Sequence, residues 1–247
     1  MSGHARFTFD IETGPSEEIA KYIAPYPTFD PASVKVGNLK DEEKIAEKIQ
    51  NAEKLHNQGR EPYYDSETKK LLTKSYASRV EAIGINITDL NNKTENYILS
   101  GDESHILSTF WGMLTQFNGM FLDRVICGWN IKEFDFPFIV QRSWRYRTKI
   151  HWNSFCNKTP FRGNKIYYND FICDLMHIFA CGSFTNKWTS LDNASKSVLG
   201  HGKPDGMTGD MYWKLSRSTD LMEREQAKQY LKTDLNLVDE MSTILLG

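Results

Sequence analysis

The sequence predicts an α/β fold in which a mixed β-sheet is flanked by helices, and three observations carry this prediction. Residues 5–12 alternate between apolar and polar side chains, which is the period of a half-buried strand. Residues 79–88 and 94–99 are separated by the turn-like sequence DLNN and predict a β-hairpin. Residues 103–119 and 220–245 repeat apolar side chains at helical spacing. Strands and helices therefore mix along the chain.

The remaining elements follow from shorter patterns. The apolar run RVICGW at 124–129 predicts a buried strand directly after the helix 103–119. A helix is predicted over 136–144, because Pro137 is tolerated in a first turn and Asp135 is suited to be its N-cap. Another helix is predicted over 188–199.

The chain is predicted to form a single domain over 1–247, with an insertion at about 14–78. This stretch is much longer than the few residues that usually connect two strands. Its centre, KDEEKIAEKIQNAEKLHNQ, places apolar side chains on one stripe and predicts a helix that lies on the main body. Its flanks, which contain PYPTFDP and EPYYD, predict ordered loops.

Composition narrows the class of protein. Hydrophobic residues make up 40% and charged residues 25% of the chain, and no stretch approaches the ~18 apolar residues of a membrane span. The N-terminal residues lack an apolar leader, and the four cysteines show no CxxC spacing, so we expect core thiols in a reducing, cytoplasmic compartment. A net charge of -2 argues against a protein that grips nucleic acid with its whole surface.

Acidic residues recur at three places where an α/β sheet could bring them together. Asp10 and Glu12 lie two residues apart on one face of the first strand, and Asp135 stands at a helix start. Tyr230 and Asp234 lie four residues apart and share one helical face. Each signal is weak alone, but two-metal phosphodiester hydrolysis needs carboxylates that hold cations ~3.5 to 4 Å apart. Together the acids favour a metal-dependent phosphodiesterase.

These segments resemble the three exonuclease motifs of the DnaQ-like superfamily in its DEDDy branch, and most closely the proofreading domain of family B DNA polymerases. FDIET at 9–13 resembles the first motif, Asn130 to Asp135 the second, and Tyr230 to Asp234 the third. SLDNASKSVLG and GKPDG resemble the stretch before the third motif, so the resemblance spans essentially the whole chain. It implies a ribonuclease H-like fold and a stand-alone 3′-to-5′ exonuclease. The long insertion departs from the polymerase pattern.

The resemblance also implies roles for single residues. Asp10, Glu12 and Asp234 would ligate a first cation, Asp10 would bridge to a second, and Asp135 would hold that second ion directly or through water. Tyr230 would orient the attacking water, because position 229 is Gln where histidine-type relatives carry His. An all-oxygen ligand set favours Mg²⁺ or Mn²⁺.

A segment that contains basic residues and no acidic residue could contact the nucleic acid. Residues 142–165 contain seven cations and no acid, mixed with aromatic residues, and such mixtures bind single strands by charge and stacking. The candidate contacts here are Arg142, Arg145, Arg147 and Lys149. The alternative is that the aromatic side chains belong to the core and the arginines are merely solvated.

Three further candidates lie inside or beside the motifs. Thr13, Asn130 and Phe134 could steady the terminal nucleotide, although Phe134 could equally be a core residue.

Three functions are compatible with this pattern. The favoured one removes nucleoside 5′-monophosphates from the 3′ ends of single-stranded DNA in repair or replication, with proteins of those processes as partners. The second is a 3′-to-5′ exoribonuclease, which would use the same metal site. The third is a catalytically silent nucleic-acid-binding module, and the intact acids together with Tyr230 argue against it.

Overall fold

The computed structural model describes residues 4–158, 166–182, 189–204 and 208–247. The chain divides into two compact units. The main unit comprises Met1–Gly14 and Arg79–Gly247, and the inserted unit comprises Pro15–Ser78. Each unit is described below by itself.

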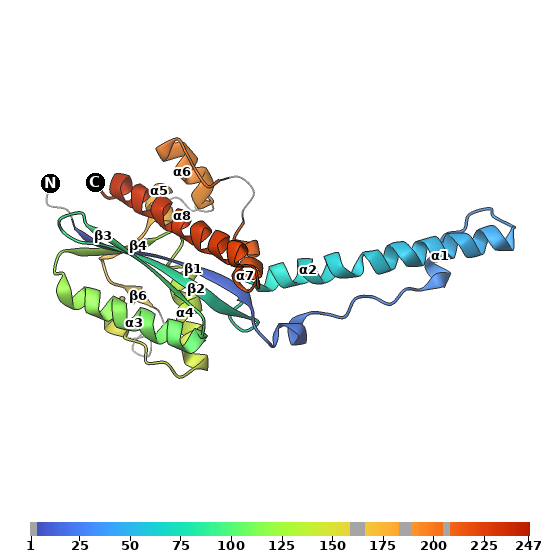
Figure 1. Ribbon diagram of the computed structural model, residues 1–247, viewed down its shortest axis with the longest axis horizontal. Coiled ribbons are helices and arrows are strands. Elements are labelled where there is room, and N and C mark those ends of the chain that lie inside the picture. Colours follow the sequence, from blue (N-terminus) through green and yellow to red (C-terminus); the bar gives the residue numbers. More distant parts are fainter. Residues whose placement is uncertain (1–3, 159–165, 183–188, 205–207) are drawn as a thin grey trace. The chain divides into compact units, whose positions relative to one another are not determined.

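A five-stranded sheet forms the centre of the main unit (Figure 1). Its strand order is β3-β2-β1-β4-β7. Strand β4 pairs in parallel with both β1 and β7, whereas β2 and β3 form an antiparallel hairpin, so the sheet is mixed as predicted. The strands are β1 (Ala5–Pro15), β2 (Ser78–Thr88), β3 (Thr94–Ser100), β4 (Arg124–Gly128) and β7 (Ile172–Asp174). Two short strands, β5 (Cys156–Lys158) and β6 (Tyr167–Tyr168), form a separate antiparallel pair.

Helices cover both faces of this sheet (Figure 1). One face carries α3 (Glu103–Met120) and α4 (Asp135–Arg145). The other carries α5 (Leu175–Phe179), α6 (Leu191–Leu199), α7 (Gly209–Ser216) and the long α8 (Leu221–Leu245). Aromatic rings fill the core beneath α3 and α4: Phe9 on β1 lies 5.1 Å from Phe110 and 5.0 Å from Phe136, measured between ring centroids. Burial of these rings fixes β1 in the middle of the sheet.

Helix α8 packs very closely on β2, and Gly84 makes this approach possible. A Cβ atom at this position would lie 2.5 Å from Cδ1 of Leu235 and 2.9 Å from Cγ of Leu231. Because Gly84 has no side chain, the backbone of β2 can lie directly beneath the apolar face of α8. The helix that bears Tyr230 and Asp234 is therefore held tightly against the sheet.

The structure confirms the strand at 5–12, the hairpin, the strand at 124–129 and the long helices at 103–119 and 220–245. The helix predicted over 188–199 is present as α6, and residues 183–188 lie outside the described residues. Short β7, α5 and α7 were not predicted, because elements of three to eight residues carry little periodicity.

One predicted cap is wrong. Phe134, not Asp135, is the N-cap of α4, because the carboxylate of Asp135 accepts a hydrogen bond from the backbone N–H of Ile11 instead.

The inserted unit contains two consecutive helices, α1 (Glu42–Gln58) and α2 (Arg60–Leu71), preceded by the short 3₁₀ helices η1 (Ile19–Tyr22) and η2 (Pro31–Ser33). The prediction of a loop at EPYYD is wrong, since these residues belong to α2. The segment before α1 runs along the helices: the hydroxyl of Tyr26 donates to the carbonyl of His56 at 2.8 Å, and Tyr63 donates to that of Ala24 at 3.2 Å. Neither helix contains a buried residue. The packing of α1 on the main body stays a prediction.

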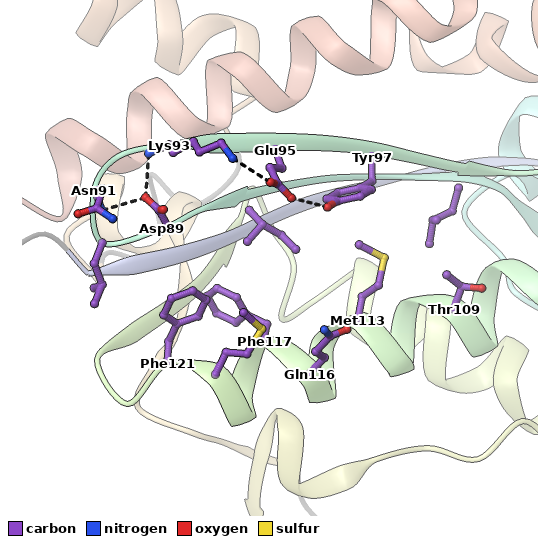
Figure 2. A pocket seen from close by; sticks show the side chains of 14 residues that line it. Asp89, Asn91, Lys93, Glu95, Tyr97, Thr109, Met113, Gln116, Phe117 and Phe121 are labelled. Carbon is purple, nitrogen blue, oxygen red and sulfur yellow. Dashed lines mark hydrogen bonds and ion pairs between the residues drawn. The ribbon is translucent and has the colours of Figure 1, made fainter.

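A cavity of about 680 Å³ lies between the edge strand β3 and helix α3 (Figure 2). Its floor is apolar and includes Leu99 and Phe117. At its rim the Glu95 carboxylate accepts hydrogen bonds from the Tyr97 hydroxyl at 2.6 Å and the Lys93 ammonium at 3.4 Å. These rim groups therefore form hydrogen bonds with one another.

Two predictions from composition have different outcomes. None of the described helices is long and apolar enough to cross a membrane. All four cysteines are free thiols, but only Cys127 and Cys156 are buried, so the expectation that all four belong to the core is wrong for exposed Cys181.

Candidate metal centre

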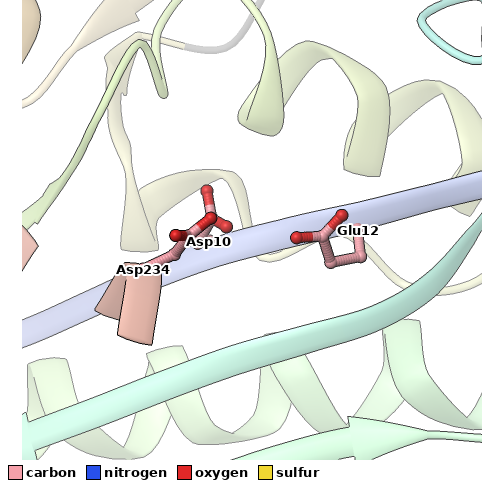
Figure 3. Close-up of side chains that lie close together, drawn as sticks. All are labelled: Asp10, Glu12 and Asp234. Atoms are coloured by element: carbon pink, nitrogen blue, oxygen red, sulfur yellow. The ribbon is translucent and has the colours of Figure 1, made fainter. Parts of the chain in front are cut away.

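Three carboxylates converge at the middle of the sheet (Figure 3). Asp10 and Glu12 project from β1, and Asp234 projects from α8. Each offers an oxygen, and these oxygens all lie within 4.8 Å of one another. Glu12 and Asp234 are buried and Asp10 is half-buried. The expected spacing on the strand and the expected helix thus bring these acids together.

Asp135 lies beside this group at the start of α4. It is 2% exposed, and its Oδ1 atom accepts a hydrogen bond of 3.2 Å from the backbone N–H of Ile11, the residue between Asp10 and Glu12. This bond ties the start of α4 to the strand that carries the first two acids. Asp135 is therefore adjacent to the cluster without belonging to the closest group of three.

Burial and mutual repulsion oppose ionisation of these acids. Burial, then the charge of Asp234, raises the pKa of Asp10 to about 7, against the lowering effect of Lys203. Burial also raises the pKa of Glu12 and that of Asp135, with nearby Asp10 adding to both. Several negative charges in a site of low polarity destabilise the ionised forms, and a bound cation would reverse this effect.

Lys203 is the functional candidate that the sequence analysis missed. Its ammonium group donates hydrogen bonds of 2.6 Å to Oδ2 of Asp234 and 2.9 Å to the hydroxyl of Tyr230. It lies in the GKPDG segment, whose sequence indicates only a resemblance to the stretch before the third motif. A cation four residues from a helix end has no periodic signal, so only the fold could show that it faces an acid on α8.

Tyr230 lies one helical turn before Asp234, as predicted, and its side chain is largely buried. Burial, then the charges of Asp234 and Glu12, raises the pKa of its hydroxyl. The hydroxyl therefore keeps its proton at neutral pH and can donate it in a hydrogen bond. A cavity of about 190 Å³ opens beside Tyr230, Asp234 and Lys203.

The donor set fits a divalent cation. Oδ1 of Asp234 is buried and has no hydrogen-bond partner among the described residues, and buried polar atoms are rarely left this way. The group offers carboxylate oxygens only, which suits hard cations such as Mg²⁺ or Mn²⁺. The residues present are therefore compatible with a metal centre.

The predicted substrate contacts fall into two groups. Thr13, Asn130 and Phe134 are half-buried; Thr13 lies on β1 with Asp10 and Glu12, and the other two lie just before Asp135 in the chain. Oδ1 of Asn130 is buried without a partner among the described residues, whereas the Phe134 ring packs on Phe138 at 5.6 Å.

The second group lies at the other end of α4. Arg142 is buried in an ion pair of 2.6 Å with Glu103, so its prediction as a surface contact is wrong. Arg145, Arg147 and Lys149 are exposed. Two of the seven cations, Arg162 and Lys165, lie outside the described residues.

The mixed sheet with helices on both faces defines a ribonuclease H-like fold, and carboxylates from β1 and α8 converge on it. The chain belongs to the family described as predicted 3′-5′ exonucleases related to the exonuclease domain of PolB, which matches residues 61–237. The matched part includes Asp135, Tyr230 and Asp234 and begins after Asp10 and Glu12.

The fold has a counterpart among solved structures. The family B DNA polymerase of the hyperthermophilic archaeon Pyrobaculum calidifontis is 12% identical and aligns with a TM-score of 0.52 over 99% of this chain. The alignment covers 25% of that polymerase, so this chain spans a quarter of its length. The likeness confirms the ribonuclease H-like exonuclease fold. Comparison with curated proteins gives no match.

Proposed function

We propose that this protein is a DEDDy-type 3′-to-5′ exonuclease that releases nucleoside 5′-monophosphates from the 3′ ends of single-stranded DNA. One observation carries the proposal: carboxylate oxygens of Asp10, Glu12 and Asp234 lie within 4.8 Å of one another, beside Asp135 and Tyr230. Family membership supports exonuclease activity in general. The remaining details rest on the site.

Each acid has a distinct task in this proposal. Asp10, Glu12 and Asp234 would hold a first cation, with the orphaned Oδ1 of Asp234 as a candidate ligand atom. Asp10 and Asp135, which lie close enough for the charge of one to raise the pKa of the other, would hold a second cation, Asp135 directly or through water. Two such ions, when bound, supply an activated water and stabilise the leaving oxygen. Ile11 keeps Asp135 in place through its backbone N–H.

Tyr230 and Lys203 would position the reacting groups. The Tyr230 hydroxyl keeps its proton and can donate to the oxygen of the attacking water. Lys203 holds the Asp234 carboxylate and the Tyr230 hydroxyl from one side, so both groups are restrained before substrate binds. Asn130, with its unpartnered Oδ1, and half-buried Thr13 are proposed to contact the terminal nucleotide.

The test is cleavage of labelled single-stranded DNA and RNA, each blocked at the 5′ or the 3′ end, with Mg²⁺, Mn²⁺ or a chelator. We expect shortening from a free 3′ end of DNA only when a divalent ion is present. Asp234→Asn should abolish cleavage, because it removes a ligand charge with little change in shape. Activity that survives the chelator and this variant would contradict the proposal, and faster cleavage of RNA would make the protein an exoribonuclease.

Tyr230→Phe separates positioning from metal binding. It keeps the ring and the ligands but removes the hydroxyl, so kcat should fall by roughly 10- to 10³-fold while metal affinity stays unchanged. A wild-type single-turnover rate would leave Tyr230 as a packing residue. In parallel, reversing the exposed charges of Arg145 and Arg147 should flatten the salt dependence of DNA binding if the end of α4 contacts the strand.

A further inference from the structure

A cationic cavity lies on the main unit beyond the C-terminal end of α7. It measures about 480 Å³ and is bounded by the start of β2, the end of β3, α7 and the first turns of α8. Four cations line it, against two carboxylates: Arg79, Arg217, Arg224 and Lys228 against Glu81 and Glu225. The cavity therefore carries an excess of positive charge, unlike the chain as a whole, whose net charge is -2.

A buried carboxylate holds one side of this cavity rigid. Glu81 is 5% exposed and accepts hydrogen bonds of 2.8 and 3.1 Å from the Arg79 guanidinium, and it also pairs with Arg217. The Arg217 guanidinium lies 5.5 Å from the centre of the Trp213 ring. A Cβ atom at Gly14 would lie 2.5 Å from Oε1 of Glu81, so the absence of a side chain at Gly14 leaves room for this carboxylate. Two guanidinium groups thus share one buried negative charge.

The other side of the cavity is exposed and adaptable. Arg224 and Lys228 lie one turn apart on α8, and both side chains are exposed. Lys228 contacts Glu225 at 3.4 Å, and an exposed pair of this length is easily exchanged for another anion. Guanidinium and ammonium groups grouped in this way suit phosphate oxygens.

Helix α7 connects this cavity to the carboxylate cluster. At its first residue, Gly209, a Cβ atom would lie 3.6 Å from the Tyr230 hydroxyl and 3.7 Å from Oε2 of Glu12. At its other end, Ser216 and the next residue, Arg217, line the cavity. Eight helical residues at ~1.5 Å each span about 12 Å. A stacked strand with a rise of ~3.4 Å per nucleotide covers this distance in roughly three to four nucleotides.

We propose that the cavity binds backbone phosphates of the substrate strand, about three to four nucleotides to the 5′ side of the nucleotide that is hydrolysed. This rests on the proposed exonuclease function. The carboxylate cluster binds the 3′ end of the strand. The strand then runs along α7 to the four cations that line the cavity. The protein would then favour strands long enough to reach both places.

The experiment compares Arg224→Glu/Lys228→Glu with Lys93→Glu, a control for reversing an exposed lysine in the same kind of ion pair. Lys93 is exposed at the β2–β3 hairpin (Figure 2) and forms an ion pair of 3.4 Å with Glu95, as Lys228 does with Glu225. One readout is the ratio of kcat/KM for a ten-nucleotide strand to that for a dinucleotide. The other is the salt dependence of binding of the ten-nucleotide strand, measured by fluorescence anisotropy in an Asp234→Asn background.

We expect the double variant to lower the length ratio by roughly tenfold and to reduce the salt slope by about 1.4, since each phosphate contact to a single strand contributes about 0.7. Lys93→Glu should leave both readouts unchanged. If the wild type hydrolyses DNA but the double variant keeps its slope and its length ratio, the phosphate subsite is wrong and the proposed function stands. If no strand is hydrolysed with Mg²⁺ or Mn²⁺, the proposed function fails, and the anisotropy titration still decides the subsite.

Discussion

Lys203 affects the carboxylate cluster through direct contacts and through its positive charge. Its ammonium contacts Asp234 and Tyr230 directly, and its charge lowers the pKa of Asp10, Glu12 and Asp234, against the effect of burial. A site of this kind needs its acids ionised to hold cations, and Lys203 helps to keep them so. The lysine would therefore act on the acids rather than on the substrate.

Lys203→Met should lower kcat by about 10- to 100-fold, because Asp234 and Tyr230 lose the group that restrains them. It should also move the acidic limb of the pH–rate profile to higher pH, since removal of a nearby positive charge raises the pKa of the acids. Lys203→Arg keeps the charge and should retain the wild-type position of that limb. The measurement is single-turnover cleavage from pH 5.5 to 9. An acidic limb that is the same in all three proteins would show that Lys203 serves packing alone.

Asp10 should make the metal-free protein less stable as the pH rises. Burial and the neighbouring Asp234 raise its pKa from 3.8 to about 7 in the folded state. Between these values the folded state binds more protons than the unfolded state, so the free energy of unfolding falls as pH rises from about 4 to 7. A bound divalent ion stabilises the ionised form and should cancel this loss.

Asp10→Asn cannot ionise, so its melting temperature in a chelator should fall less between pH 4.5 and 7.5 than that of the wild type. A change of 1 kcal/mol corresponds to roughly 2–4 °C for a domain of this size. Asp170→Asn makes the same chemical change at an exposed position and should behave as the wild type does. The explanation fails if Asp10→Asn follows the wild-type curve. Added Mg²⁺ should raise the melting temperature of the wild type and not that of Asp10→Asn.

The acids could be predicted from the sequence because each has a local signature. Asp10 and Glu12 follow the alternation of β1, and Tyr230 and Asp234 follow the period of α8. Lys203, Arg142 and Glu81 could not be predicted, because their roles depend on partners far along the chain: Asp234, Glu103 and Arg217. A long-range ion pair leaves no periodic pattern in the sequence.

At the scale of elements, the metal centre depends on how closely α8 lies on β2. Gly84→Ala should destabilise the protein by about 1–3 kcal/mol, because the added methyl group would overlap Leu231 and Leu235 and push α8 away from the sheet. It should also weaken Mn²⁺ binding, since α8 carries Asp234. Urea unfolding and a metal titration measure the two effects.

Gly112→Ala is the matched control for this change. Gly112 lies on the exposed side of α3, and nothing lies within 4 Å of a Cβ placed there. Alanine is favoured over glycine inside a helix by about 1 kcal/mol, so this variant should be slightly more stable than the wild type. If both glycine variants lose stability equally, the cost comes from the backbone and not from the packing of α8.

The long elements could be predicted because their periodicity extends over many residues, as in α3 and α8. Helix α7 could not, although one of its ends lies beside Glu12, because it has only eight residues and begins with Gly209. Helix α2 was missed because its tyrosines and proline resemble a loop. In both helices the local pattern of apolar residues is too weak to predict the structure.

At the scale of the whole molecule, the insertion joins the main unit through two neighbouring ends. The Ser16 backbone N–H donates to the carbonyl of Ala77 at 3.1 Å, and its hydroxyl donates to the same oxygen at 2.7 Å. The helices α1 and α2 bury no residue, and their described contacts with the Tyr26 segment lie inside the inserted unit. The insertion is therefore an addition whose ends a short linker can span.

Replacing residues 16–77 by a short Gly-Ser linker should preserve the fold, because the change removes no side chain from the core clusters of the main unit. We expect a cooperative thermal transition and retained Mg²⁺-dependent cleavage of a dinucleotide. Because the insertion leaves directly from the strand that carries Asp10 and Glu12, we further expect the kcat/KM for a twenty-nucleotide strand to change more than that for the dinucleotide. Loss of the cooperative transition would make the insertion a structural part of the fold, whereas equal changes for both substrates would show that it does not handle the strand.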